Sequence, residues 1–244
     1  MSRLILGIQP VREAIRAHGY GLEQVLVERG DNPKLQAIGR FATDQGIAVE
    51  ERSRGDLDRM AAGGRHQGVI ALAPELRLRR LEELVVEPTS IFMALDGVMD
   101  PQNFGAVIRS AVALGARAIL WPEHASAPLS PATFRASAGA IEHATLCRVP
   151  SLPDALLSLA SQGATAVALD AQGPTELGAL DLAGPVVIVV GAEDKGVRRP
   201  VRRACHHAAR LPMSGPIGSL NASVAAALAL YEVLRQRQTR SLTP

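Results

Sequence analysis

The chain has 244 residues, of which 47% are hydrophobic and 20% are charged, as in an ordinary globular protein of one large or two small domains. Aromatic residues make up only 3%, which argues against a broad aromatic platform for single-stranded nucleic acid. The net charge of +2 excludes a global basic field, so any nucleic-acid site must be a local patch.

The two cysteines, Cys147 and Cys205, form no Cys-x-x-Cys pair, so we expect neither a disulfide framework nor a zinc site. Cys205-His206-His207 could suggest a metal, but adjacent residues on a strand point to opposite faces, and we expect no metal. The apolar part of the N-terminus is too short for a secretory signal, and no apolar run has membrane length. A cytoplasmic protein without membrane contact is therefore expected.

Residues 1–73 are predicted to form a small α/β domain. We expect helices at 10–17, 33–44 and 54–61, and strands at 24–28, 47–50 and 69–72. The glycine-rich basic loop that contains His66 and Gln67 has two interpretations, an RNA contact or a plain turn, and the residues leave both open. Residues 74–89 mix arginines and glutamates between prolines, which predicts a linker with a solvated charged face.

Residues 90–244 are predicted to form a second α/β domain. Strands are expected at 91–95, 118–121, 145–149, 165–169, 186–190 and 207–211, and helices at 103–114, 131–137, 152–161, 197–203 and 222–236. The strands are continuous apolar runs, which is typical of a parallel sheet that helices cover on both faces. Ligands of such sheets bind beyond the carboxyl ends of the strands, so the loops after Leu95, Val190 and Leu211 carry the functional interpretation.

The first of these loops leads from a buried strand through Asp100-Pro101 into a helix that carries Asn103 and Arg109. The two side chains are six positions apart, so they do not share a helical stripe, and they could converge only if Asn103 precedes the regular helix. Taken alone, a helix N-terminal asparagine with a solvated arginine explains this stretch as well as a functional site does.

The second loop, Gly191 to Gly196, is rich in glycine but matches neither a dinucleotide-binding fingerprint nor a P-loop. Four arginines follow it, and helical spacing places them in two pairs on one side of a helix: Arg198, Arg199, Arg202 and Arg203. Like charges this close repel unless an anion is nearby, and the guanidinium group matches phosphate geometry. We therefore favour phosphate binding over a solvated face.

The third loop runs from Leu211 through two prolines and two glycines to Ser219-Leu220-Asn221, which caps a long helix rich in small residues. Plain N-capping accounts for one polar residue but leaves the irregular loop unexplained.

In this order the three loops resemble the SpoU family of RNA ribose 2'-O-methyltransferases, the TrmH type of the SPOUT superfamily. The matching patterns are Asn103-x5-Arg109, Gly191-x-Glu193-x-x-Gly196, and Leu211-Pro212-Met213 followed by Ser219-Leu220-Asn221. Arg135 to Ala140 is also similar to a family segment. The first domain resembles the family's ribosomal-protein-L30e-like substrate-binding extension through Leu6-Gly7-Ile8 and His66-Gln67-Gly68. The whole chain is most similar to the branch that methylates a guanosine of 23S rRNA.

The resemblance implies a deep trefoil knot at the C-terminal end of the sheet, although knots are rare in general. S-adenosylmethionine is expected in the knot, held by Gly191, Glu193, Gly196, Leu211, Met213, Ser219 and Leu220. RNA is expected to contact His66, Gln67, Arg109, Arg198, Arg199 and Arg202. The family is usually a homodimer that packs through the knot helices, here including 222–236, and Arg109 could then serve a site built from two subunits.

For catalysis the resemblance implies that Arg109, held by Asn103, assists removal of the ribose proton. Because arginine is effectively always protonated, a role in orienting phosphate and stabilising oxyanion charge stays open beside that of a base. Ser219 and Asn221 would orient Arg109 and the ribose, while Glu193 would hold its loop. Two alternatives remain: a tRNA substrate, and an RNA-binding or ribosome-assembly module without turnover, which the intact set of polar residues disfavours.

Overall fold

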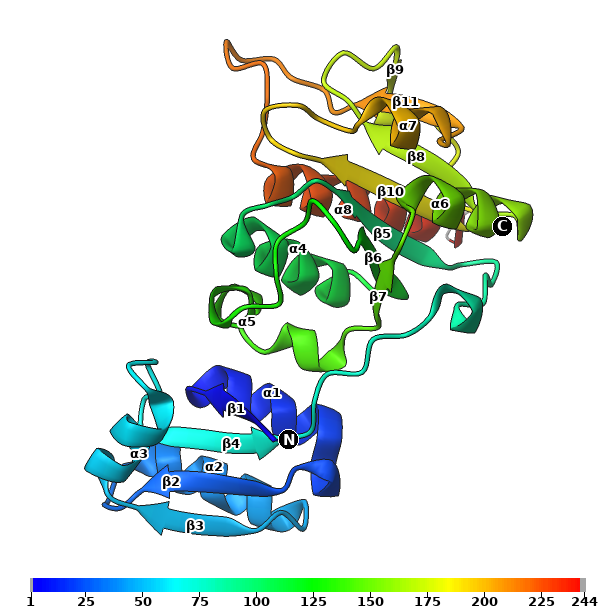
Figure 1. Cartoon of the computed structure of the whole chain (residues 1–244). Helices are drawn as coiled ribbons and strands as arrows, with labels where there is room; N and C mark the ends of the chain where they lie inside the picture. The colour runs from blue at the N-terminus through cyan, green and yellow to red at the C-terminus, as the bar shows by residue number, and fades with distance from the viewer. Residues whose placement is uncertain (1, 242–244) are drawn as a thin grey trace. The chain divides into compact units, whose positions relative to one another are not determined.

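The computed structural model of the chain describes residues 2–241, and these form two compact units (Figure 1). The first unit contains the chain up to residue 77 together with residues 138–143, and the second contains 78–137 and the chain from 144 onward. The sequence placed residues 138–143 in the second domain, so this short segment is a feature that the single predicted boundary did not foresee.

The first unit contains a four-stranded mixed sheet with the order β1-β4-β2-β3. Only β2 and β3 are parallel. Its strands are β1 (Arg3–Leu6), β2 (Gln24–Glu28), β3 (Val49–Arg52) and β4 (Val69–Ala73), and its helices are α1 (Ile8–His18), α2 (Pro33–Asp44) and α3 (Arg54–Ala61), with a 3-10 turn η1 (Gly19–Gly21). Side chains from α1 and α2 pack with one face of the sheet, and those of α3 pack with the other.

The segment 138–143, which contains the 3-10 turn η3 (Ala140–His143), is fixed to the first unit by charge and by close packing. The side chain of Glu142 is only 1% exposed and accepts hydrogen bonds from Arg3 and, at 2.8 Å, from Nε2 of His18. Gly139 has a φ of 89°, and a Cβ there would lie 2.9 Å from the Cα of Pro10. This position therefore requires glycine.

The second unit is built on a seven-stranded sheet with the order β7-β6-β5-β10-β8-β11-β9, and every pair of neighbours is parallel. The strands are β5 (Ile91–Asp96), β6 (Ala118–Pro122), β7 (Leu146–Val149), β8 (Thr165–Leu169), β9 (Thr175–Glu176), β10 (Val186–Gly191) and β11 (His207–Arg210). β5 and β10 lie side by side and are buried along their whole length. The predicted parallel sheet is therefore confirmed.

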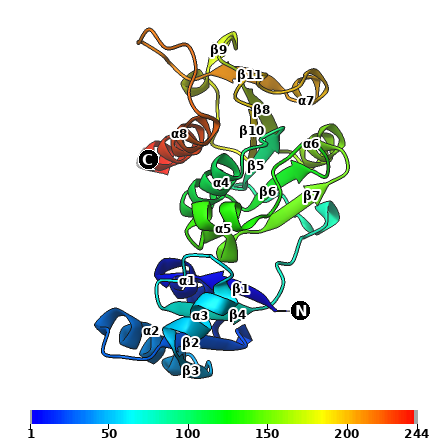
Figure 2. The same ribbon diagram turned by 60° about the vertical axis from the view of Figure 1, so that its left-hand side comes forward.

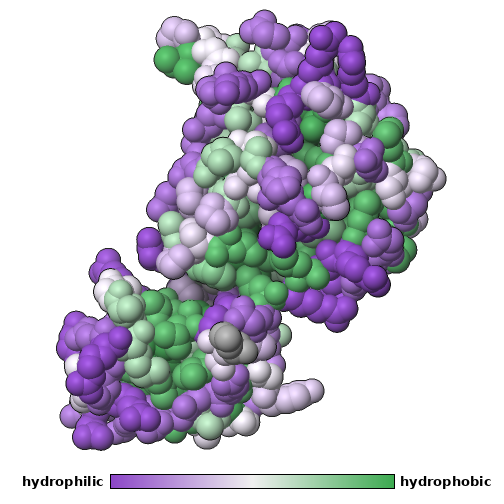
Figure 3. All heavy atoms as spheres, viewed as in Figure 1, coloured by the Kyte–Doolittle hydropathy of each residue, from purple (hydrophilic) through white to green (hydrophobic). Residues whose placement is uncertain are grey.

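Helices cover both faces of this sheet (Figure 1, Figure 2). α6 and α7 pack on one face, while α4 and α8 pack on the other and α5 lies against α4. Their bounds are α4 (Pro101–Ala113), α5 (Pro131–Ser137), α6 (Leu152–Ser161), α7 (Arg199–Arg203) and α8 (Ala222–Ser241), with 3-10 turns η2 (Leu81–Glu83) and η4 (Leu177–Ala179). On the face shown in Figure 3, hydrophilic residues take up much of the surface, and hydrophobic residues show between them.

Most predicted elements are confirmed, with shifts of a few residues at their ends. β3 begins at Val49 instead of residue 47, and α8 continues to Ser241. The short strands β1 and β9 were not predicted, because two to four residues show too little periodicity. The trefoil knot stays a prediction. Within residues 2–241, no helix is both long and apolar enough to span a membrane.

Arg237 links the end of α8 to the beginning of the central strands. Its guanidinium group donates to the carbonyl oxygens of Thr89 and Gly184, both at 2.7 Å, and burial lowers its pKa below the ordinary value for arginine. We expect Arg237→Met to lower the free energy of unfolding by about 2–3 kcal/mol, because charged hydrogen bonds are lost and two carbonyl groups lose a donor.

Equilibrium urea unfolding measures this effect. Arg240→Ala is the matched control, because Arg240 pairs with Asp181 where both side chains are well exposed. Its effect should stay within about 0.5 kcal/mol. Equal effects of the two substitutions would contradict the role given to Arg237.

Candidate functional site

The loops that leave the central strands of the second unit meet at the carboxyl edge of the sheet. β10 lies between β5 and β8, and all three strands point the same way. Asp96, Gly191 and Leu169 end these strands, so the chain segments that follow them begin at one edge. Open parallel sheets bind ligands at this edge.

A cluster of three polar side chains joins the three loops singled out from the sequence. Asn103 donates from Nδ2 to Oε1 of Glu193 at 2.9 Å, and Asn221 donates from Nδ2 to the same oxygen at 2.6 Å. Asn221 also donates to Oδ1 of Asn103 at 2.8 Å. Asn103 lies in the first turn of the helix after the first loop, Glu193 lies in the second loop and Asn221 ends the third, so the cluster fixes these three segments relative to one another.

Helix capping orients two members of this cluster. Asp100 accepts hydrogen bonds from the backbone N–H groups of Gln102 and Asn103, and Pro101 opens the first turn of α4. At the start of α8, Oδ1 of Asn221 accepts the backbone N–H of Ser223 at 2.9 Å. With its oxygen turned to the helix, the amide nitrogen of Asn221 must face Glu193.

The loop after β10 folds back on its own origin. The backbone N–H of Gly196 donates to the carbonyl of Ala192 at 2.7 Å, and Gly196 has a φ of 62°. A Cβ on Gly191 would lie 2.0 Å from the carbonyl carbon of Gly196 and 2.2 Å from the nitrogen of Val197. Any side chain at Gly191 would therefore collide with backbone, and only glycine fits.

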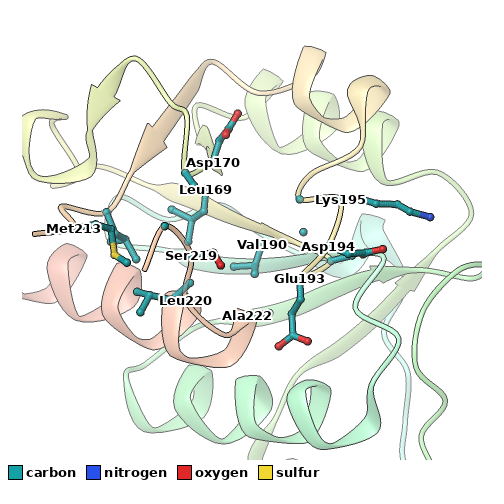
Figure 4. A pocket seen from close by; sticks show the side chains of 17 residues that line it. Leu169, Asp170, Val190, Glu193, Asp194, Lys195, Met213, Ser219, Leu220 and Ala222 are labelled. Atoms are coloured by element: carbon teal, nitrogen blue, oxygen red, sulfur yellow. The ribbon is translucent and has the colours of Figure 1, made fainter. Parts of the chain in front are cut away.

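A cavity of about 320 Å³ lies beside this loop, within the size range of small-molecule sites (Figure 4). All seven residues that the resemblance assigned to S-adenosylmethionine line it: Gly191, Glu193, Gly196, Leu211, Met213, Ser219 and Leu220. The wall also includes Leu169 and Asp170 from the end of β8, whereas the side chain of Lys195 extends away (Figure 4). The predicted residues thus come together at one site.

A second cavity, of about 260 Å³, lies next to the polar cluster. It is lined by the loop after β5, including Met99 and Asp100, and by Asn103. Ala192, Glu193, Asp194 and Ala222 line both cavities. A group bound in one cavity would thus share a wall with a group bound in the other.

Comparison with known proteins accounts for this arrangement. Residues 90–231 match the SpoU rRNA Methylase family, and residues 4–79 match the RNA 2'-O ribose methyltransferase substrate binding family. The first match spans more than half of the chain. The chain belongs to the SpoU rRNA methylase family.

Related proteins extend this likeness over both units. A Mycolicibacterium vanbaalenii protein described as an uncharacterized tRNA/rRNA methyltransferase is 40% identical over 98% of this chain and 78% of its own length. The crystal structure of the SpoU methyltransferase AviRb from Streptomyces viridochromogenes in complex with AdoMet has a TM-score of 0.80 at 26% identity, covering 98% and 91% of the two chains. A crystal structure of an RNA 2'-O ribose methyltransferase has a TM-score of 0.79 at 32% identity, covering 97% and 89%.

Arg109, the arginine of the first SpoU motif, lies apart from the polar cluster. Asn103 is already within α4, so Arg109 follows about 9 Å along the helix axis and about 120° around it. Arg109 is exposed and has no hydrogen-bond or salt-bridge partner among residues 2–241. The contact between Asn103 and Arg109 that the resemblance implied is not formed within the chain.

The four arginines after the second SpoU motif divide into two kinds. Arg198 pairs with Asp96, and Arg202 pairs with Asp170. Arg199 and Arg203 are exposed and have no partner in the described part of the chain. From the sequence we expected all four arginines to form one phosphate-binding group. In the structure, Arg199 and Arg203 are the two that do not pair with a carboxylate of the described residues.

His66 and Gln67, which were expected to contact RNA, hold their own loop in the first unit. His66 is buried, accepts the backbone N–H of Gly68 at Nδ1, and contacts Asp58 through Nε2 at 2.8 Å. Because Nδ1 accepts, Nε2 carries the proton and donates to Asp58. The side chain of Gln67 accepts the backbone N–H of Ile8 at the start of α1. Neither ring nitrogen of His66 is open to a ligand.

Cys205 and His206 are also engaged within the fold. Burial raises the pKa of Cys205 to about 12, and its thiol donates to the carbonyl of Val201. His206 accepts the backbone N–H of Ala166 at Nδ1. Among residues 2–241 there is no group of three or more histidine, cysteine or acidic side chains that could hold a metal, and both cysteines are free.

The sequence did not single out Leu169, Asp170 or Asp96, although all three lie at the carboxyl edge. The one feature of the sequence that could have indicated them is their position at, or directly after, the ends of predicted buried strands. Apolar strands carry no mark of which neighbours they will have in the sheet, so this signal could not be connected with the SpoU motifs.

Proposed function

We propose that this chain transfers the methyl group of S-adenosylmethionine to a ribose 2'-hydroxyl of RNA, with a guanosine of 23S rRNA as the substrate. The observation that carries the proposal is the cavity in which all seven residues expected for the methyl donor lie together, with the Asn103–Glu193–Asn221 cluster at its edge. Relatives named as methyltransferases, one of them bound to AdoMet, support it.

The cavity suits the donor. Its wall contains Asp170, Glu193 and Asp194. Arg202 pairs with Asp170 and the side chain of Lys195 extends away, so the carboxylates of Glu193 and Asp194 are the charges that favour a cationic sulfonium ligand. Gly191 and Gly196 both line the cavity, and because neither carries a side chain, main-chain groups form that part of its wall. S-adenosylmethionine supplies an activated methyl group, and what the protein must add is in-line positioning of the ribose oxygen.

The second cavity is where we expect the acceptor ribose. It contacts the same side chain of Glu193 that borders the donor cavity, so a group there can face the methyl across a short distance. Arg109 is assigned the role of orienting the RNA phosphate and stabilising charge on the ribose oxygen. Asn221 holds Glu193, which lines both cavities, and Ser219 lines the donor cavity.

A homodimer would bring a second copy of Arg109 or of the polar cluster to the site. α8 leaves Val224, Leu228 and Tyr231 exposed at positions i, i+4 and i+7, which form one apolar stripe. The opposite side of α8 packs on β10 and α4. A stripe of this kind, with an exposed tyrosine, fits an interface with a second copy of the chain.

The decisive experiment incubates the purified protein with S-adenosylmethionine, EDTA and unmodified 23S rRNA or tRNA transcripts, and maps 2'-O-methyl groups at nucleotide resolution. One 2'-O-methylguanosine in 23S rRNA is expected. Methylation of tRNA alone would replace the proposed substrate. RNA binding without methylation of either transcript would favour the assembly-module alternative, and loss of activity in EDTA would contradict a metal-free reaction.

Arg199 and Arg203 are expected to contact RNA phosphates, because they are exposed, adjacent on α7 and unpaired among the described residues. Replacing both by glutamine should reduce the slope of log K against log salt by about two units, one for each lost contact. Donor binding should not change. A salt titration of RNA binding measures this slope. An unchanged slope would mean that both arginines face solvent and do not contact RNA phosphates.

A further inference from the structure

Two acidic side chains flank β10 at the carboxyl edge of the sheet. Asp96 is the last residue of β5, on one side of β10, and Asp170 directly follows β8 on the other. Each is paired with an arginine from the segment that contains α7. The segment 198–203, which follows the donor loop, is therefore held by one ion pair on each side of β10.

The pair of Asp96 and Arg198 joins a buried carboxylate to an arginine whose side chain is 47% exposed. Asp96 is 0% exposed, and its Oδ2 accepts the backbone N–H of Arg198 at 2.7 Å. Its Oδ1 accepts Nε of the same arginine at 2.7 Å and lies 2.6 Å from Nη2. The carboxylate thus holds both the main chain and the side chain of Arg198, in a forked geometry that lysine cannot reproduce.

The pair of Asp170 and Arg202 is partly open to solvent. Asp170 accepts a hydrogen bond from Arg202 through Oδ2 and, at 2.9 Å, from the backbone N–H of Gln172 through Oδ1. About a third of each side chain in the ion pair is exposed. Asp170 also lines the donor cavity. Because the carboxylate of Asp170 is open to solvent, screening weakens this pair relative to the one with the buried carboxylate of Asp96.

The loop from 192 to 197 is held by Glu193 near its start and by the Gly196–Ala192 backbone hydrogen bond, and Asp96 holds the residue that follows its end. It leaves β10 at Gly191, which is paired in register with Asp96, and it comes back over Gly191 before reaching Arg198. The 196–197 backbone lies so close to Gly191 that a small shift would alter the cavity wall. Asp96 therefore holds the loop at the point where it must close.

We propose that Arg198 and Arg202 are positioning residues for the methyl-donor site, acting through Asp96 and Asp170, and that they are not RNA contacts. This inference rests on the proposed function, because it assumes that S-adenosylmethionine binds in the cavity beside the loop. The arginine cluster then has two separate roles, since Arg198 and Arg202 shape the donor pocket while Arg199 and Arg203 face the RNA.

The experiment measures the dissociation constant of S-adenosylmethionine by calorimetry and the salt slope of RNA binding for the same variants of the full chain. Arg198→Gln should weaken donor binding at least about tenfold, because it leaves the buried charge of Asp96 unpaired. Arg198→Lys should recover part of that loss. Arg202→Gln should have a smaller effect, and RNA salt slopes should match the wild type for all three.

Combining Asp96→Asn with Arg198→Gln should weaken donor binding less than Arg198→Gln alone, since no unpaired buried charge remains. In steady state, Arg198→Gln should raise KM for the donor while kcat at saturating donor stays within a few-fold. A general loss of folding would instead lower Tm and the number of binding sites, and leave the affinity of the remaining sites unchanged.

Arg199→Gln provides the opposite pattern, with a salt slope reduced by about one unit and unaltered donor affinity. The inference is overturned if Arg198→Gln lowers the RNA salt slope and leaves donor affinity intact, or if only Tm and site number fall. Failure of the wild-type protein to bind S-adenosylmethionine would overturn the proposed function itself. Wild-type binding with unchanged affinity in Arg198→Gln would overturn this inference alone.

Discussion

Gly191→Ala is expected to abolish measurable binding of S-adenosylmethionine while the second unit stays folded. The added Cβ would lie 2.0 Å from the carbonyl carbon of Gly196, a distance that real Cβ atoms do not adopt. The atoms that this Cβ would meet belong to the backbone of Gly196 and Val197 and cannot rotate away, so the loop 192–197 must move as a whole. That loop forms one wall of the donor cavity and carries Glu193, so the pocket and the polar cluster are lost together.

Gly218→Ala is the matched control for this result. Gly218 lines the same cavity, but a Cβ there meets no atom within 4 Å. Calorimetric affinity of the control should stay within about threefold of the wild type, since the substitution only reduces backbone freedom. If Gly191→Ala also bound the donor with near-normal affinity, the cavity would not be the donor site.

Arg109→Lys should separate chemistry from binding. Lysine keeps the positive charge but loses the planar fork that orients phosphate. Affinity for S-adenosylmethionine and most of the affinity for RNA should be retained. The single-turnover methylation rate should nevertheless fall by roughly a hundredfold or more, the scale of a lost transition-state contact.

The pH dependence of the Arg109→Lys rate distinguishes the two roles considered for this residue. If positioning is the defect, raising the pH should not restore the rate. If proton removal is the defect, a higher pH should restore part of it, because more of the ribose hydroxyl is ionised. Arg148→Lys, at an exposed position on β7, is the control and should react at the wild-type rate. A near-normal rate for Arg109→Lys at neutral pH would leave Arg109 as a phosphate anchor only.

The sequence was sufficient to predict the parallel sheet and to single out the loops that line the cavity beside Gly191. Apolar runs mark buried strands, and the irregular loops after them stand out because their glycines and polar residues interrupt regular patterns. The resemblance of these loops to the SpoU motifs then predicted that Gly191, Glu193 and Leu220 contact S-adenosylmethionine. Strand order was not accessible, because identical apolar runs carry no mark of which neighbours they will have.

The arginine cluster shows why partners are harder to predict than positions. Helical spacing brought Arg198 and Arg202 to one side of α7, and four neighbouring cations suggested an anion in solution. The carboxylates that neutralise two of them belong to residues 102 and 32 positions earlier in the chain. His66 follows the same rule, since its partner Asp58 lies on α3, eight residues away in sequence.

The segment 138–143 limits how members of this family can be recombined. The first unit is assembled from two separate stretches of chain, with the carboxylate of Glu142 buried against Arg3 and His18. A chimera that exchanges residues 1–77 for those of a relative would leave this carboxylate facing a foreign surface. Residues 138–143 must therefore be exchanged together with residues 1–77. The gene segment for residues 1–77 alone does not encode the complete first unit.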